Sequence, residues 1–227
     1  PTTSGTGSEV GRSTVISDDV TKEKKILFAP SLMAKKVFVD PTLSIGLPPF
    51  ITATTGIDAL THNIEAYLAS GFNPMCDGMA LEAIKLVNNS LEKATKDPCV
   101  KSRGEMAMAA LIGATAFQKG LGVVHSMAHP LSTKFNMHHG LANAICLPTG
   151  VKFNDEVVPE RVDEIAKMFE LESGRGLAKY LEKYISNLGL PTNLSSQGVE
   201  PDDIEHLSDL AMNDPCHGAN PRPLTKD

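Results

Sequence analysis

Apolar residues recur at intervals of three and four along most of the chain after Pro48. On a helix, residues spaced in this way share one face, so the pattern predicts amphipathic helices. Clusters of glycine, proline and asparagine, such as SGFNP at 70–74 and LGLPTN at 188–193, separate the periodic segments. The predicted helices span Ile51–Ala69, Cys76–Ala94, Val100–Gln118, Val123–Lys134, Leu141–Phe153, Val162–Phe169, Gly176–Ser186 and Ile204–Met212.

The beginning of the chain follows a different pattern. It is rich in threonine, serine and glycine, and its β-branched and aromatic runs at Ser13–Ile16 and Val37–Val39 predict two strands. Because strands and helices barely interleave, we expect a mainly α protein in which a short β-rich remnant of an α/β domain precedes an all-helical domain. The chain starts at Pro1 without a methionine, and we expect it to be part of a longer protein.

Composition narrows the classes of partner. With 227 residues the chain can bury a substantial core. Its 21 lysines and arginines against 27 acidic residues give a net charge of −6, which argues against nucleic-acid and anionic-membrane partners. No apolar run approaches the roughly 20 residues of a membrane span, and no signal-peptide pattern opens the chain. The four cysteines form no C-x-x-C pair. We therefore expect a cytoplasmic protein with reduced thiols and small-molecule ligands.

Histidines are the candidate functional residues, since five of the seven lie between residues 62 and 139. Asp58 and His62 are four residues apart, which places them on one helix face with Cβ atoms about 5–6 Å apart. His125 and His129 repeat this spacing, and Pro130 directly after them predicts a kink. Either pair alone would ordinarily be a solvated or hydrogen-bonded pair. Their neighbours are mostly apolar, however, and buried ionisable groups need a partner or a metal.

A metal site built from such residues would favour certain ions. Three imidazoles and one carboxylate suit a divalent first-row ion such as Fe²⁺ or Zn²⁺, and they offer too few oxygens for Mg²⁺ or Ca²⁺. Imidazole serves iron and zinc alike, so the ligand types leave both ions open.

Six blocks of sequence, taken in order, resemble one protein family. They are PTTSGTGSEV (1–10), TTGIDALTHNIEAYLA (54–69), NPMCDGMALEAIKLV (73–87), GVVHSMAHPL (122–131), HGLANAICLP (139–148) and NPR (220–222). Their order and spacing are similar to those of the iron-containing (group III) alcohol dehydrogenases, the family of lactaldehyde reductase and propanediol dehydrogenase. The resemblance extends over essentially the whole chain.

The resemblance implies a two-domain oxidoreductase that uses NAD or NADP. Residues 1–46 would be the C-terminal part of the α/β dinucleotide-binding domain, and residues 47–227 the all-helical catalytic domain that binds the metal. The glycine-rich GGGS segment that holds the cofactor pyrophosphate in the family does not occur in this chain. We therefore expect a fragment, inactive alone, of an enzyme that forms a homodimer or a higher homo-oligomer.

The resemblance also assigns roles to individual residues. Four of them match the metal ligands of the family, namely Asp58, His62, His125 and His139. His129 matches a histidine beside the metal that helps with substrate binding or proton transfer without being a ligand.

Cofactor contacts carry over to the N-terminal part of the chain. The matching residues are Thr2, Thr3, Thr6 and Lys24.

Two departures from the family pattern concern the substrate side of the site. Ser132 stands where relatives have a glycine, and His138 stands where they have a proline, so that His138 and His139 are adjacent candidates for one ligand position.

These residues lead to the hypothesis of hydride transfer between a short-chain alcohol or diol and NAD(P), with the metal polarising the substrate oxygen. His129 would relay the alcohol proton to solvent, because imidazole is the side chain that most readily exchanges protons near neutral pH. Three alternatives remain open: a metal-dependent phosphohydrolase, although no His-Asp doublet occurs; a lyase of the dehydroquinate synthase type; and a helical metal-binding module without catalysis.

Overall fold

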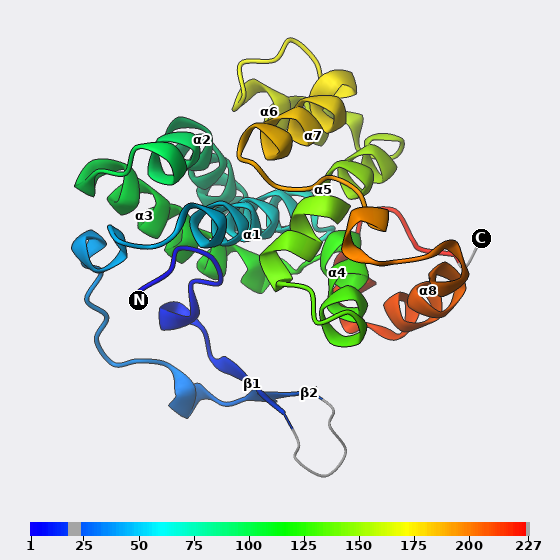
Figure 1. The fold of residues 1–227 in the computed structure, drawn as a ribbon, viewed down its shortest axis with the longest axis horizontal. Coiled ribbons are helices and arrows are strands. Elements are labelled where there is room, and N and C mark those ends of the chain that lie inside the picture. The colour runs from blue at the N-terminus through cyan, green and yellow to red at the C-terminus, as the bar shows by residue number, and fades with distance from the viewer. Residues whose placement is uncertain (18–23, 226–227) are drawn as a thin grey trace.

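Figure 1 shows the computed structural model as helices gathered around a central helix, with a two-stranded sheet projecting from the N-terminal arm. The structure describes residues 1–17 and 24–225. Each of the eight segments predicted to be helical is a helix in this part of the chain, which confirms a mainly α fold with a small β-rich start. The helices are α1 Pro49–Leu68, α2 Pro74–Lys96, α3 Val100–Ala116, α4 Val123–Lys134, α5 His139–Asp155, α6 Pro159–Lys167, α7 Leu177–Asn187 and α8 Ile204–Asn213.

Helix α1 is the centre of the fold and packs against α2, α3 and α5. Its residues are buried on almost every side, so its polar side chains need partners inside the protein. Several find them in nearby backbone carbonyls. The Thr61 hydroxyl donates to the Ile57 carbonyl at 2.8 Å, and the Asn63 amide donates to Ala59 and Ala109. This helix therefore carries Asp58 and His62 into the interior.

An ion-pair group joins α2 to the turn after α3 and to α6. The Asp77 carboxylate lies 2.5 Å from the Lys119 ammonium and 2.9 Å from the Arg161 guanidinium. Lys119 also donates to the carbonyl of Tyr67 near the end of α1. The Lys119 side chain is only 2 % exposed, so Asp77 is the group that neutralises its buried charge.

The start of α4 is held by the C-terminal NPR segment. Asn220 accepts a hydrogen bond from the backbone N–H of Val123 at 3.2 Å, in the first turn of α4. Its amide also exchanges hydrogen bonds of 2.8 and 3.1 Å with the amide of Asn154 on α5. These bonds join α4, α5 and the C-terminal segment. The helix then continues past Pro130 to Lys134, as its apolar spacing predicts.

The strand predictions are half right. β1, Ser13–Ser17, forms where Ser13–Ile16 predicts it, and it pairs antiparallel with β2, Lys24–Phe28. The sequence pattern misses β2 because its charged first residues interrupt the apolar run. Val37–Val39 is wrong as a strand: no neighbouring strand pairs with it among the described residues, and Phe38 is 80 % exposed.

Within residues 1–17 and 24–225, no individual helix is both long and apolar enough to cross a membrane. The helices Val100–Lys119 and Val123–Lys134 pass that test only as a pair, and they are bent by 110° at their junction.

Candidate metal centre

Three helices bring together a carboxylate and two imidazoles, of which Asp58 and His125 are buried and His139 is partly exposed. Asp58 comes from α1, His125 from α4, and His139 is the first residue of α5. The Asp58 Oδ1 atom lies 3.4 Å from His139 Nε2 and 3.9 Å from His125 Nε2. One ligand atom from each residue lies within 4.8 Å of the others. A divalent ion with bonds of about 2.0–2.2 Å holds its ligand atoms about 3–4 Å apart, so these three could share one ion with small adjustments.

The amide of Asn143 on α5 shows that these atoms converge. Its Nδ2 atom lies 2.7 Å from Asp58 Oδ1, 3.2 Å from His139 Nε2 and 3.4 Å from His125 Nε2. An amide NH₂ group is only a donor, and each imidazole Nε2 atom can accept from it in the tautomer that carries its proton on Nδ1. A group of acceptors that surrounds an NH₂ also suits a cation. The residues present therefore fit a divalent metal ion.

The protonation states of these three residues also suit a metal site. Burial would raise the pKa of Asp58, but the nearby histidines and the Asn143 amide outweigh it and keep that pKa below its ordinary value. Burial lowers the pKa of both His125 and His139. The cluster at neutral pH is thus one anion and two neutral imidazoles, the forms that ligate a metal.

His62, the fourth predicted ligand, lies beside this cluster. Its Nδ1 atom is 4.0 Å from Asp58 Oδ2, and its ring stacks on that of His125 with centroids 4.7 Å apart. Nδ1 of His62 is buried and has no hydrogen-bond partner among the described residues. A buried polar atom of this kind is costly, and a shared cation would give it a partner.

Glu65, one turn beyond His62 on α1, fixes the orientation of His125. Its carboxylate lies 2.6 Å from His125 Nδ1 and accepts the backbone N–H of Val124, also at 2.6 Å. Burial raises the pKa of Glu65 to about 7 against these hydrogen bonds. Because the Glu65 carboxylate contacts Nδ1, the Nε2 atom of His125 stays free on the side that faces Asp58. Metal-binding histidines usually contact a carboxylate or carbonyl in this way through the nitrogen that does not bind the metal.

His129 lies at the edge of the cluster and outside the three-ligand group. Its ring centroid is 5.4 Å from that of His139 and 5.9 Å from that of His125. Its Nδ1 is 2.7 Å from the carboxylate of Asp214, just after α8. The side chain is 34 % exposed, so His129 connects the cluster to solvent.

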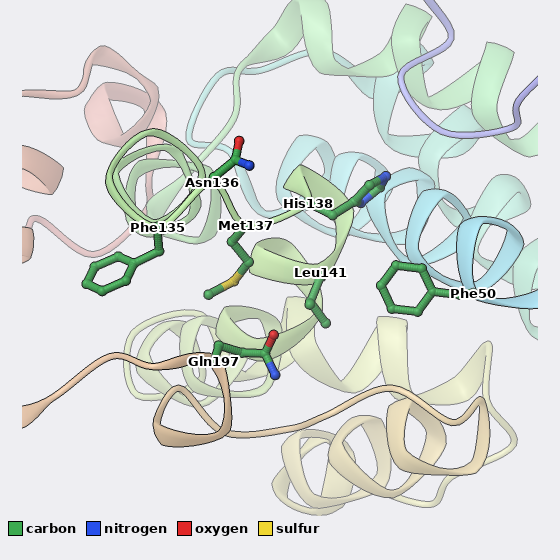
Figure 2. A pocket seen from close by; sticks show the side chains of 7 residues that line it. All are labelled: Phe50, Phe135, Asn136, Met137, His138, Leu141 and Gln197. Carbon is green, nitrogen blue, oxygen red and sulfur yellow. The ribbon is translucent and has the colours of Figure 1, made fainter.

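The adjacent histidines at the start of α5 have different surroundings. His138 is exposed, and its ring lies edge-on to that of Phe50 with centroids 6.1 Å apart. Together with Phe50 it lines a pocket of about 260 Å³ (Figure 2). His139 instead approaches Asp58. Of the two candidates for one ligand position, only His139 belongs to the cluster within the described part of the chain.

The N-terminal segment passes close to the cluster. A Cβ atom at Gly5 would lie 3.3 Å from the Asp58 carboxylate, and one at Gly7 would lie 2.4 Å from the Ala110 carbonyl on α3. Gly7 also has a φ of +63°, which favours glycine. The segment can therefore lie directly on α1 and α3.

The predicted cofactor residues lie on or after this segment. Thr2, Thr3 and Thr6 are exposed on it. Lys24 is the first residue of β2, and its side chain lies outside the described residues.

Residue-by-residue reasoning misses three residues of this site: Glu65, Asn143 and Asp214. Glu65 and Asn143 lie within the sequence blocks that carry the family resemblance. For Glu65, the sequence did contain a signal of a buried functional carboxylate. Glu65 lies seven residues after Asp58, so both are on the same face of the predicted helix, and the residues around them are apolar. Asp214 is 85 residues from His129, and no local spacing indicates their contact.

Several known proteins are similar to the chain over nearly its whole length. A family model described as "Fe-containing alcohol dehydrogenase family, C-terminal" matches residues 52–227. The chain is 39% identical to 4-hydroxybutyrate dehydrogenase of Cupriavidus necator, with 98% of this chain and 60% of that protein covered. It is 35% identical to lactaldehyde reductase of Escherichia coli K12, with 99% and 61% covered.

A solved structure of 1,3-propanediol oxidoreductase superimposes with a TM-score of 0.95 at 34% identity, covering 99% of this chain and 62% of that one. The chain thus spans about 60% of the length of the relatives that it matches.

Proposed function

The chain belongs to the iron-containing alcohol dehydrogenase family, and on that premise we propose that it forms the metal-binding part of an NAD(P)-dependent alcohol dehydrogenase. The substrate would be a short-chain alcohol or diol, or the aldehyde in the reverse direction. The observation that carries the proposal is the convergence of Asp58, His125 and His139 from three helices on one point. The names of two relatives point the same way: an NAD-dependent methanol dehydrogenase of Bacillus methanolicus, and a sulfoacetaldehyde reductase of Bifidobacterium kashiwanohense solved with NAD⁺.

The metal would be held by Asp58, His125 and His139, with His62 as the fourth ligand. A divalent ion bound there supplies a Lewis acid for the substrate oxygen. The family model favours iron, whereas the donor set accepts zinc as well. Glu65 keeps the proton of His125 on Nδ1, so that Nε2 stays available.

His129 is the candidate for moving the alcohol proton. The Asp214 carboxylate accepts from its Nδ1–H, which leaves a lone pair on Nε2. Nε2 can take up the proton of the substrate hydroxyl, and the partial exposure of the ring lets the proton pass to solvent. A bound nicotinamide would supply the acceptor for the hydride of the carbinol carbon, a role that none of these side chains can fill.

The N-terminal segment would contribute to binding the nicotinamide cofactor. Its main chain lies against Asp58 at Gly5, so a ligand on this segment would be next to the metal cluster. The exposed hydroxyl groups of Thr2, Thr3 and Thr6 can donate hydrogen bonds to phosphate or amide groups.

Metal analysis combined with turnover tests the proposal. The chain, purified anaerobically, should carry iron in an amount that His125→Ala abolishes and His129→Ala preserves. In the intact enzyme, both substitutions should lower the oxidation of short alcohols and diols, assayed with NAD and with NADP. His206→Ala, on the exposed surface of α8, is the matched control and should change neither quantity.

Full metal content and turnover in His125→Ala would refute the ligand assignment. A bound metal without turnover on any alcohol would instead favour a lyase or a non-catalytic module.

A further inference from the structure

A second group of side chains that could bind a metal lies next to the cluster around Asp58, on its exposed side. It consists of His129 on α4, Asp214 just after α8, and Cys216 in the short helical turn Pro215–Ala219. One ligand atom from each lies within 4.8 Å of the others. All three residues are partly exposed, so an ion from solvent can reach them. This group shares no residue with the cluster around Asp58.

Hydrogen bonds hold the carboxylate of this group in place. Asp214 Oδ1 accepts from the Ser126 hydroxyl at 3.0 Å and from the backbone N–H of Cys216 at 2.9 Å. Its Oδ2 is 2.7 Å from His129 Nδ1. The Cys216 Sγ atom lies within 4.8 Å of the ligand atoms of Asp214 and His129. These three ligand atoms are already close together, so little reorganisation is needed for them to share one ion.

The donor set selects a particular class of ion. Thiolate and imidazole are the preferred ligands of Zn²⁺ and of softer divalent ions, and three protein ligands with an open fourth position are a common zinc arrangement. Tetrahedral zinc with bonds of about 2.0–2.3 Å places its ligand atoms about 3.3–3.7 Å apart, within reach of this group. The cluster around Asp58, in contrast, contains no sulfur.

We propose that His129, Asp214 and Cys216 form a second site for a soft divalent cation such as Zn²⁺, separate from the cluster around Asp58. On binding, the Cys216 thiol releases its proton to solvent and forms a sulfur–metal bond. The His129 proton moves from Nδ1 to Nε2, and Nδ1 binds the ion. The two negative charges of the thiolate and the carboxylate then balance the ion.

Occupancy of this second site has a consequence for catalysis, and this part rests on the proposed function. With a proton on Nε2 and the ring held by the ion, His129 can no longer accept the proton of the substrate hydroxyl. Zn²⁺ in excess of the first equivalent should therefore inhibit turnover reversibly. Cys216→Ser should weaken that inhibition.

Cadmium binding provides a test that needs no turnover. Thiolate bound to Cd²⁺ absorbs in the ultraviolet by charge transfer, and only a site that contains cysteine gives this signal. We expect the absorption in the wild-type chain titrated with Cd²⁺, and its loss in both Cys216→Ser and Asp214→Asn.

Two control variants distinguish this site from the remaining thiols and from the first cluster. Cys99→Ser removes another partly exposed thiol, at the start of α3, where serine is a good capping residue, and it should keep the signal. Asp58→Asn disables the first cluster and should also keep the signal. Circular dichroism of each metal-free variant checks its fold. In the wild-type chain, moreover, prior alkylation of Cys99 should leave the cadmium signal in place, which gives a result even if a variant misfolds.

The proposal is overturned if the wild-type chain shows no cadmium–thiolate absorption, or if Cys216→Ser retains it. Loss of the signal in Asp58→Asn would assign the thiol to the first site and would also overturn it. These outcomes are independent of whether alcohol oxidation is found, so the second site and the dehydrogenase proposal can fail separately.

Discussion

Replacing Gly140 with alanine would test whether the cluster around Asp58 depends on the close approach of α5 to α1. Gly140 directly follows His139, and a Cβ atom there would lie 2.1 Å from the carbonyl oxygen of Thr54 and 2.6 Å from its carbonyl carbon. Thr54 is fully buried in α1, one turn before Asp58. Because both obstructing atoms are backbone, no side-chain rotation can relieve the overlap.

The magnitude follows from these distances. Non-bonded atoms prefer separations of about 3.5 Å, and the closest contact would be 2.1 Å, so the two helices would have to move apart by about 1.4 Å. Such overpacking lowers the free energy of unfolding by about 1–3 kcal/mol. The better helix propensity of alanine offsets up to about 1 kcal/mol of this loss. The same movement would carry His139 and Asn143 away from Asp58. We expect the affinity for the metal to fall by about 10- to 100-fold, as when the support of a ligand is lost.

Urea unfolding and competition against a chelator would measure the two effects. The matched control is Gly78→Ala on the exposed face of α2, where a Cβ atom meets nothing within 4 Å. That variant should gain up to about 1 kcal/mol in stability and keep its metal affinity. If Gly140→Ala matched Gly78→Ala in both assays, the reasoning about helix approach would be refuted.

Three further predictions concern single side chains. Glu65→Gln should lower metal affinity by about 10- to 100-fold in the same competition assay, because its amide cannot accept from both donors that the carboxylate serves. Asp77→Asn should lower the free energy of unfolding by about 3 kcal/mol, since it leaves the buried Lys119 ammonium without its counter-ion. Alkylation of the native chain at pH 8, followed by peptide mass spectrometry, should label Cys99 well before Cys146. Hydrogen bonds from Ser102 lower the pKa of Cys99, whereas burial raises the pKa of Cys146 to about 12.

Each of these has an outcome that would contradict it. Unchanged metal affinity in Glu65→Gln would mean that His125 needs no orienting partner. For Asp77, the control is Asp97→Asn, whose lysine partner is exposed and which should have little effect. An equal loss of stability in the two variants would contradict the role of the buried charge. Faster labelling of Cys146 would mean that the α5 region opens readily in the native state.

The helices were predictable because their apolar spacing is a local property of the chain. The bounds of α4 are those predicted, and Asn73 caps α2 within the punctuation at 70–74. The run at Val37–Val39 fails because a strand also requires a partner, which local sequence does not report. Asp40 instead caps a short 3₁₀ turn, accepting the backbone N–H of Thr42 at 2.9 Å.

The candidate site was predictable only in part, for a related reason. Helical spacing places Asp58 and His62 on one face, yet the closest imidazole nitrogens to Asp58 belong to His139 and His125, on other helices. Periodicity does not say which helices will meet. The family resemblance supplied that grouping, whereas the contact between His129 and Asp214 needed the structure.

The Asn143 amide has a consequence for the integrity of the interior. By donating to Asp58 and facing two imidazoles, it links side chains from α1, α4 and α5 at the point where their acceptor atoms meet. One amide thus serves three helices, and a group that only accepts could not replace it. Even the isosteric change Asn143→Asp would place two like charges side by side inside the protein.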